Sequence, residues 1–245
     1  MTAVFLHGVP DTPRIWGPLL NALGIQEQDV AAPSLPGFGT SLPDGFSATA
    51  SGYANWFERE LEKIVAFNGP VDLVGHDWGG ILAWRLVNSR PDLFRSWTII
   101  AAPIWPSYRW HLFARFWQTP LLGEITTTIT PKSVAVMLLS RWGMPQDLAK
   151  KEASHVNALM RQSILSLYRS GKQIGKDWSM QKSLDKSAGL FIFAERDPFM
   201  KVTEAANFAA SIEVECHIEA RAGHWLIAEK PDAVAAIINR HWHRS

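Results

Sequence analysis

An aspartate among closely spaced glycines is the feature of this sequence with the clearest chemical potential. Residues 71–80 read VDLVGHDWGG, so Asp77 follows a short apolar run and precedes an apolar helical pattern. The order strand, Gly-x-Asp-x-Gly and helix is the pattern of a nucleophile elbow, which holds one side chain above the carboxyl edge of a sheet. A carboxylate in that place is ionised at neutral pH and needs no base before it attacks an electrophilic carbon.

The glycines around Asp77 fit this interpretation. In an elbow the central residue is strained, and a side chain at Gly75, Gly79 or Gly80 would collide with the neighbouring strand or helix. We also expect the N-terminus of a helix at Asp77, where the helix dipole stabilises an anion. The alternative is an ordinary helix N-cap, which aspartate also favours, but the glycine pattern favours the nucleophile.

The surrounding sequence alternates predicted strands with predicted helices. Short apolar runs indicate strands, and apolar residues at helical spacing indicate helices. The predicted strands are 3–6, 29–32, 71–74, 97–101, 189–193 and 213–217. The predicted helices between them are 13–23, 53–65, 78–88 and a last one that begins at Pro231. This alternation predicts an α/β fold whose mostly parallel sheet has helices on both faces.

The alternation stops between about residues 104 and 183, where tryptophan clusters and helical patterns occur without a convincing strand. We expect this segment, inserted after the fourth strand, to form a helical lid over one end of the sheet. The predicted domains are therefore a core of residues 1–103 and 184–245 and a lid of residues 104–183.

Composition excludes several classes of function. The 245 residues suffice for one core with an insertion, and the formal net charge of +1 without a basic run disfavours nucleic acid as a partner. The single cysteine, Cys216, and the lack of a leader or membrane-spanning pattern predict a cytoplasmic protein. The 12 Trp and 12 Phe against 3 Tyr suggest a large apolar core or an aromatic-lined cavity. No spacing of His or Cys predicts a metal site, and no glycine-rich loop predicts a phosphate-bearing cofactor.

Four motifs in this order resemble those of α/β-hydrolases with an aspartate nucleophile, the group that includes epoxide hydrolases and haloalkane dehalogenases. They are HGVPD at residues 7–11, the elbow, FAERDPF at residues 193–199 and AGHWLIAEKPD at residues 222–232. The resemblance covers nearly the whole chain and implies an α/β-hydrolase fold.

The resemblance also implies roles for individual residues. Asp77 corresponds to the nucleophile, Asp197 to the acid and His224 to the general base, and the backbone N–H groups of Val9 and Trp78 correspond to the oxyanion hole. The implied reaction forms an alkyl ester on Asp77, which is then hydrolysed by water that His224 activates. Taken alone, Asp197 would fit a turn before proline and His224 a structural histidine, so the roles depend on the four motifs together.

The leaving group decides between an epoxide and a halide. The segment SLYRSG at residues 166–171 resembles the epoxide-hydrolase segment with a lid tyrosine, so Tyr168 is a candidate proton donor. The other lid tyrosine of that family corresponds to Phe113, which has no proton to donate, and Tyr108 is the nearby alternative.

A halide would instead require N–H donors. The indole of Trp78 would supply one, and a second would come from one of four tryptophans of the lid region: Trp105, Trp110, Trp117 or Trp142. Many dehalogenases have Asn where this chain has Val9. We therefore expect hydrolysis of a small apolar epoxide first and haloalkane dehalogenation second, with only substrate and water as partners. A non-catalytic protein that binds a small ligand is the alternative from another class.

The beginning of the sequence departs from the family pattern. Two strands usually precede the His-Gly strand, whereas Met1 and Thr2 alone precede it here. We expect either a sheet truncated to about six strands or a sequence that starts late. A truncated sheet would expose an edge, so a monomer and a homodimer are both compatible with the sequence.

Overall fold

A six-stranded sheet forms the centre of the part of the chain that the computed structural model describes, residues 2–178 and 188–244. The strands lie in the order β2-β1-β3-β4-β5-β6, and each neighbouring pair is parallel. They are β1 (Ala3–Leu6), β2 (Val30–Ala31), β3 (Val71–His76), β4 (Phe94–Ile100), β5 (Gly189–Ala194) and β6 (Glu215–Glu219). The predicted parallel sheet of about six strands is confirmed.

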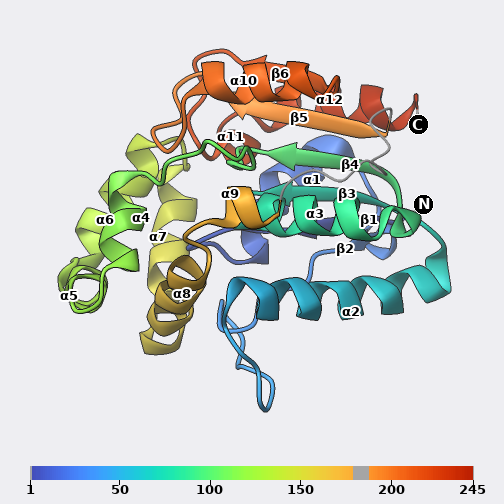
Figure 1. Cartoon of the computed structure of the whole chain (residues 1–245). Helices are drawn as coiled ribbons and strands as arrows, with labels where there is room; N and C mark the ends of the chain where they lie inside the picture. The colour runs from blue at the N-terminus through green and yellow to red at the C-terminus, as the bar shows by residue number, and fades with distance from the viewer. Residues whose placement is uncertain (1, 179–187, 245) are drawn as a thin grey trace.

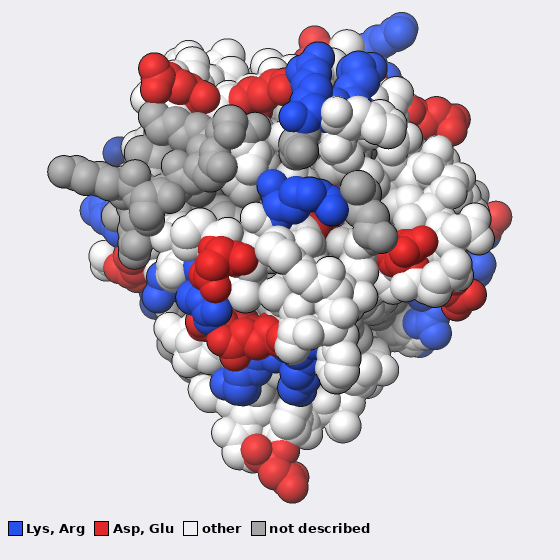
Figure 2. Space-filling model, turned by 90° about the vertical axis from the view of Figure 1, so that its right-hand side faces the viewer, with Lys and Arg blue, Asp and Glu red and all other residues white. Residues whose placement is uncertain are grey.

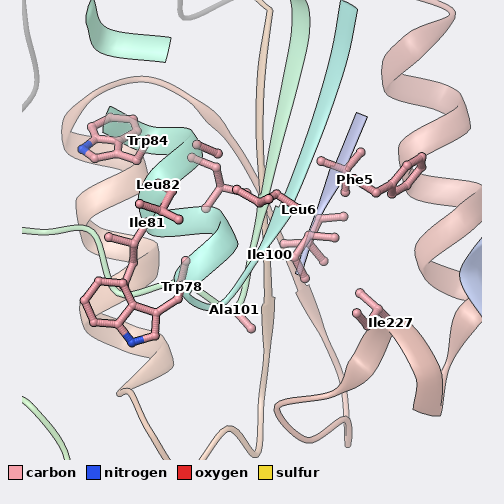
Figure 3. Packing of buried hydrophobic residues seen from close by; sticks show 14 of the residues in the cluster. Phe5, Leu6, Trp78, Ile81, Leu82, Trp84, Ile100, Ala101 and Ile227 are labelled. Atoms are coloured by element: carbon pink, nitrogen blue, oxygen red, sulfur yellow. The ribbon is translucent and has the colours of Figure 1, made fainter. Parts of the chain in front are cut away.

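The central strands are buried because their sequences are nearly continuous apolar runs. Every residue of β1, β3 and β5 is buried, as parallel strands with helices on both faces require. In Figure 3, Leu82 and Trp84 of α3 (Trp78–Ser89) lie on one side of the sheet, and Phe5 and Ile227 lie on the other.

Two groups of helices cover the two faces of the sheet. Helices α1, α11 and α12 contact one another on one face. Helices α2, α3 and α10 cover the other, where Trp84 of α3 packs against Phe208 of α10. Their bounds are α1 (Gly17–Leu23), α2 (Ala50–Asn68), α10 (Val202–Ser211), α11 (Leu226–Glu229) and α12 (Pro231–Trp242). The last helix begins at Pro231, as predicted.

Further helices, which we call the insertion, separate β4 from β5 in the chain. They are α4 (Leu112–Gln118), α5 (Leu122–Ile129), α6 (Lys132–Arg141), α7 (Gln146–His155), α8 (Ala158–Ser170) and α9 (Ile174–Asp177). Figure 1 shows α4 to α8 beyond the arrowheads of the strands, at the carboxyl edge of the sheet. No strand occurs among the described residues of the insertion. The domain boundary predicted between residues 183 and 184 lies outside the described residues.

Several predicted strand boundaries were wrong. Strand β6 begins two residues later than predicted, because the N–H groups of Glu213 and Val214 still donate to carbonyls at the end of α10. Strand β2 contains only Val30–Ala31. Strand β4 begins at Phe94, directly after a short 3₁₀ turn at Pro91–Leu93. These differences lie at strand ends and leave the predicted order of elements intact.

The surface at the amino ends of the strands has mixed charge. Figure 2 views the molecule from this side, opposite to the insertion, and shows Lys and Arg side chains next to Asp and Glu side chains. No extended patch of a single sign is visible on this face. None of the helices within the described residues has the length and hydropathy needed to cross a membrane.

Candidate active site

Asp77 occupies the sharp turn between β3 and α3. Its φ of 51° and ψ of −123° lie in a region that is strained for a residue with a side chain. The close approach of the turn to its neighbours explains the glycines. A Cβ atom at Gly75 would lie 2.7 Å from the carbonyl oxygen of Gly79, and one at Gly80 would lie 2.7 Å from the Cβ of Ala102. The turn therefore needs glycine at both positions.

The Asp77 carboxylate is buried and held by backbone N–H groups. The N–H of Val9 donates to Oδ2 over 2.8 Å, and the N–H of Trp78 also donates to the carboxylate. Burial raises the pKa of the Asp77 carboxyl above its ordinary value, against the opposing effect of His224, His76 and the two N–H groups. Both predicted oxyanion donors thus lie against Asp77.

His224 lies between the two predicted acidic residues. Its Nδ1 is 2.8 Å from Oδ2 of Asp197, and its Nε2 is 3.8 Å from Oδ1 of Asp77. Asp197 is itself oriented, because its Oδ1 accepts the N–H of Phe199 over 2.8 Å. Burial acts to lower the pKa of His224, but the charge and the hydrogen bond of Asp197 outweigh it, so this pKa lies above its ordinary value. The ring is therefore oriented with Nε2 toward the elbow.

Buried polar contacts behind His224 fix its position. The carbonyl of His224 lies 3.0 Å from Nε2 of His76. The indole N–H of the next residue, Trp225, donates to both carboxylate oxygens of Asp11 over 3.1 Å. Asp11 is fully buried, and its sequence pattern predicts no role for it beyond membership of the HGVPD motif. The residue types alone gave no sign of this contact, since Asp11 and Trp225 are 214 positions apart.

His7, in the segment after β1 that also contains Asp11, has a structural role. Its Nε2 accepts the N–H of Leu35 over 3.0 Å, and its Nδ1 lies 2.8 Å from the carbonyl of Gly8. Burial lowers the pKa of His7 to about 4, so the ring is neutral at physiological pH. His7 thereby joins the segment after β1 to the loop after β2.

A cavity of about 500 Å³ lies above Asp77 and His224. Its wall is largely aromatic and aliphatic, with Phe113, Trp117 and Tyr168 of the insertion among the lining residues. Such a wall favours an apolar ligand, because a charged group would lose hydration there without compensation.

The candidate leaving-group residues differ in whether they line the cavity and in whether they have a polar group available there. Tyr168 lines the cavity, and its hydroxyl has no acceptor among the described residues. The hydroxyl of Tyr108 instead donates to the carbonyl of Phe199 over 2.9 Å, and Tyr108 is absent from the described wall of the cavity. Phe113 lines the cavity but has no polar group. Tyr168 is thus the candidate whose O–H has no acceptor among the described residues, while its oxygen faces the indole N–H of Trp78.

The candidate tryptophans also divide into residues that line the cavity and residues whose indole N–H is bonded elsewhere. Trp105 and Trp110 direct their indole N–H groups to Glu204 and to the carbonyl of Lys172, whereas Trp117 and Trp142 line the cavity. The indole nitrogen of Trp78 is buried without a hydrogen bond of normal geometry among the described residues. The Trp78 side chain is fully buried and lies behind Tyr168, with ring centroids 5.2 Å apart, rather than in the cavity wall.

Glu152 of α7 is a buried acid that was not predicted from the sequence. It is fully buried, and its carboxylate accepts the N–H of Thr12 over 2.9 Å and the Thr12 hydroxyl over 3.1 Å. Burial, followed by the charge of Asp11, raises the pKa of Glu152 to about 7, against the hydrogen bonds from Thr12 and the charge of Arg14. Glu152 thus joins the insertion to the loop that carries Val9.

A Glu152→Gln variant is expected to gain stability relative to wild type as the pH rises. The folded-state pKa of Glu152, about 7, exceeds its ordinary value of 4.5. The contribution of Glu152 to stability is therefore fully present below about pH 4.5, and about 3 kcal/mol is lost between about pH 4.5 and pH 7, with no further loss at higher pH. Gln mimics the neutral acid and avoids this loss. Melting temperatures of both proteins between pH 5 and pH 8.5 check the prediction. Glu27→Gln, a substitution at an exposed glutamate, serves as the control. Parallel curves for Glu152→Gln and wild type would contradict the prediction.

The described residues contain no group of three His, Cys, Asp or Glu side chains arranged to hold a metal ion. The polar groups at the cavity floor are instead Asp77 and His224. Their arrangement, an ionisable carboxylate next to an oriented imidazole with two backbone N–H donors, can carry out nucleophilic attack followed by base-assisted hydrolysis.

The sequence of the chain is similar to those of known proteins. The model of a family described as the alpha/beta hydrolase family matches residues 3–237. An epoxide hydrolase of Caballeronia sordidicola is 33% identical over 94 residues, which are 38% of this chain and 28% of that protein. A haloalkane dehalogenase of Psychrobacter cryohalolentis is 32% identical over 93 residues, which are 37% of this chain and 30% of that protein. The matches thus span less than a third of these relatives.

A solved structure extends the similarity to the whole fold. The crystal structure of an epoxide hydrolase from Vigna radiata aligns with a TM-score of 0.78 at 18% identity, covering 100% of this chain and 91% of that one. At this identity the similarity concerns the fold alone.

Proposed function

The chain belongs to the alpha/beta hydrolase family, and from this premise we propose that it is a hydrolase that opens small apolar epoxides to diols through a covalent ester on Asp77. Residues 104–183 act as the lid over a core of residues 1–103 and 184–245. The observation that supports the covalent route best is the placement of His224, with Nε2 3.8 Å from Asp77 and Nδ1 2.8 Å from Asp197. The similarity to relatives named epoxide hydrolase supports the same chemistry.

In the first step Oδ1 of ionised Asp77 attacks an epoxide carbon. Oδ2 is already engaged by the N–H of Val9 at 2.8 Å, which leaves Oδ1 as the attacking atom. The carbon–oxygen bond of the ring breaks, and its electron pair passes to the ring oxygen, which takes the proton of the Tyr168 hydroxyl. The product is a hydroxyalkyl ester of Asp77, with the former Oδ2 as its carbonyl oxygen.

In the second step Nε2 of His224 takes a proton from water, and the resulting hydroxide attacks Cγ of Asp77. Negative charge develops on Oδ2, where the N–H groups of Val9 and Trp78 stabilise it. The bond between Cγ and Oδ1 then breaks, and the alcohol leaves with the proton from His224. The carboxyl group ionises, and its proton restores the Tyr168 hydroxyl.

The position of Tyr168 favours an epoxide over a halide. An epoxide oxygen leaves as an alkoxide and needs a proton, whereas a halide needs N–H donors. Tyr168 lines the cavity, while Trp78 is buried behind it. Burial and the charge of Asp77 raise the pKa of Tyr168 well above its ordinary value, so the phenol keeps its proton until a developing alkoxide meets it.

Dehalogenation is the second candidate, because Trp117 and Trp142 line the same cavity. A relative named haloalkane dehalogenase matches at similar identity. In that reaction the ester would carry the alkyl group without its halogen, and the hydrolysis step would be unchanged.

A Tyr168→Phe variant separates the two candidates. It should lower kcat/KM for styrene oxide by about 100-fold, because the alkoxide loses its proton donor. Tyr108→Phe is the matched control, since the hydroxyl of Tyr108 is bonded to the carbonyl of Phe199, and it should retain most of the activity. Unchanged epoxide turnover in Tyr168→Phe would contradict the role of Tyr168 as the proton donor. Turnover of dibromoethane but not of epoxide by wild type would overturn the epoxide proposal in favour of dehalogenation.

A further inference from the structure

The outer part of the cavity differs in chemistry from the part near Asp77. Its inner wall is apolar, with Leu139 and Ile164 buried around the site. Two cations, Lys132 of α6 and Arg161 of α8, also line the cavity, together with four threonines of α5 and of the turn that follows it. The hydroxyls of Thr126, Thr127 and Thr130 donate to main-chain carbonyls. Lys132 is exposed and Arg161 half-buried, so the cations lie toward solvent while Asp77 lies at the buried end.

The two cations have no carboxylate partner among the described residues. The ion pairs of the described chain include neither Lys132 nor Arg161. Arg169, on the same helix as Arg161, is by contrast paired with Glu124, with both guanidinium contacts at 2.7–2.8 Å. Asp77 is the only acidic residue in the described wall of the cavity.

Unpaired cations at the open end of an apolar cavity favour a specific kind of ligand. The low-dielectric wall strengthens the attraction between a cation and an anion relative to open water. An arginine can bind a carboxylate or phosphate through two parallel hydrogen bonds, and a lysine adds a mobile point charge. The apolar inner wall accommodates a hydrocarbon segment between this end and Asp77.

We propose that the substrate is amphipathic: a hydrocarbon chain with an epoxide at the Asp77 end and an anionic group, a carboxylate, sulfonate or phosphate, held by Lys132 and Arg161. This inference rests on the proposed function for the reacting group. It extends that function by making Lys132 and Arg161 residues that determine specificity. The substrate body stays apolar, and only its far end is charged.

The kinetic test compares two substrates that differ in one charge. They are the terminal epoxide of undecenoic acid and its methyl ester, each used below the concentration at which it forms micelles. Wild type should show at least about a 10-fold higher kcat/KM for the acid at low salt, with the advantage reduced by added salt. The double variant Lys132→Gln/Arg161→Gln should lose this advantage through a higher KM for the acid, so that the ratio of kcat/KM for acid and methyl ester falls to about 1 in the same protein.

Arg115→Gln is the matched control, because Arg115 is an exposed arginine of α4 outside the described cavity wall. It should keep the preference for the acid. The inference is overturned if wild type turns over acid and ester equally well, or if the double variant keeps the preference. In either case epoxide turnover itself would remain, so the proposed function would stand.

A binding test with unreactive ligands examines the anion-binding subsite independently of epoxide turnover. Isothermal titration with undecanoate and with undecanamide, neither of which can react, should show tighter binding of the carboxylate to wild type by about 10-fold and no such difference in the double variant. If no epoxide is turned over but this charge-dependent binding is found, the proposed function fails and the anion-binding subsite of Lys132 and Arg161 stands. Equal binding of both ligands to wild type would overturn the subsite.

Discussion

A His224→Gln variant is expected to consume about one equivalent of epoxide and then to stop. Asp77 can still attack, since its carboxylate and the N–H of Val9, 2.8 Å from Oδ2, are unchanged. Glutamine cannot take a proton from water at neutral pH, so hydrolysis of the ester should slow by more than about 1000-fold. Rapid-quench measurement of diol and of remaining epoxide checks this. The expected trace is an epoxide burst equal to the enzyme concentration without matching diol.

Two further variants serve as controls for this result. Asp77→Asn should show neither burst nor turnover, because the amide is not a nucleophile under these conditions. Asp197→Asn should retain the burst and slow the second step, because Nδ1 of His224 loses the carboxylate that lies 2.8 Å away. Sustained diol formation by His224→Gln would contradict a role for His224 as the base.

A Gly79→Ala variant is expected to lose both stability and activity. A Cβ at residue 79 would overlap the carbonyl oxygen of Leu6 and lie 2.6 Å from that of His7. Both atoms belong to backbone at the end of β1, so neither can rotate away, and α3 would have to move off the sheet. Such a clash should cost more than about 4 kcal/mol and lower the melting temperature by roughly 10 °C. Differential scanning calorimetry and epoxide turnover measure the two effects.

Gly17→Ala is the matched control for this variant. Gly17 has helical backbone angles, φ −48° and ψ −51°, and no atom beyond its chain neighbours and its own helix lies within 4 Å of the position of an added Cβ. Its melting temperature should fall much less than that of Gly79→Ala, because the added Cβ meets only the ring of Pro18, which disfavours helical angles at the preceding residue. Equal stability of Gly79→Ala and Gly17→Ala would contradict the tight elbow.

The elbow could be predicted from sequence because its physics is local. The apolar run of β3, the glycines and the start of α3 are adjacent in the chain, and the turn angles of Asp77 follow from them. Asp197 and His224 could be located by the resemblance of short motifs. The order of the sheet followed from the alternation of strands and helices, while strand ends such as that of β6 depend on how far the preceding helix continues.

Contacts between distant residues could not be predicted in the same way. Thr12 and Glu152 are 140 positions apart, and no local pattern marks a buried acid on an otherwise polar helix such as α7. The choice between Tyr108 and Tyr168 likewise depends on the packing of the insertion. Our proposal of Tyr168 rests on the carbonyl of Phe199, which accepts the hydroxyl of Tyr108 over 2.9 Å.

The measurement that tests the covalent route most directly is the intact mass of His224→Gln after incubation with an epoxide and, separately, with a haloalkane. We expect a mass gain equal to the whole epoxide, which disappears when Asp77→Asn is added to the same protein. A gain equal to the alkyl group without its halogen, seen only with the haloalkane, would retain the ester and move the reaction to dehalogenation. No adduct while wild type turns over the same epoxide, or an adduct that persists without the Asp77 carboxylate, would contradict the proposed ester on Asp77.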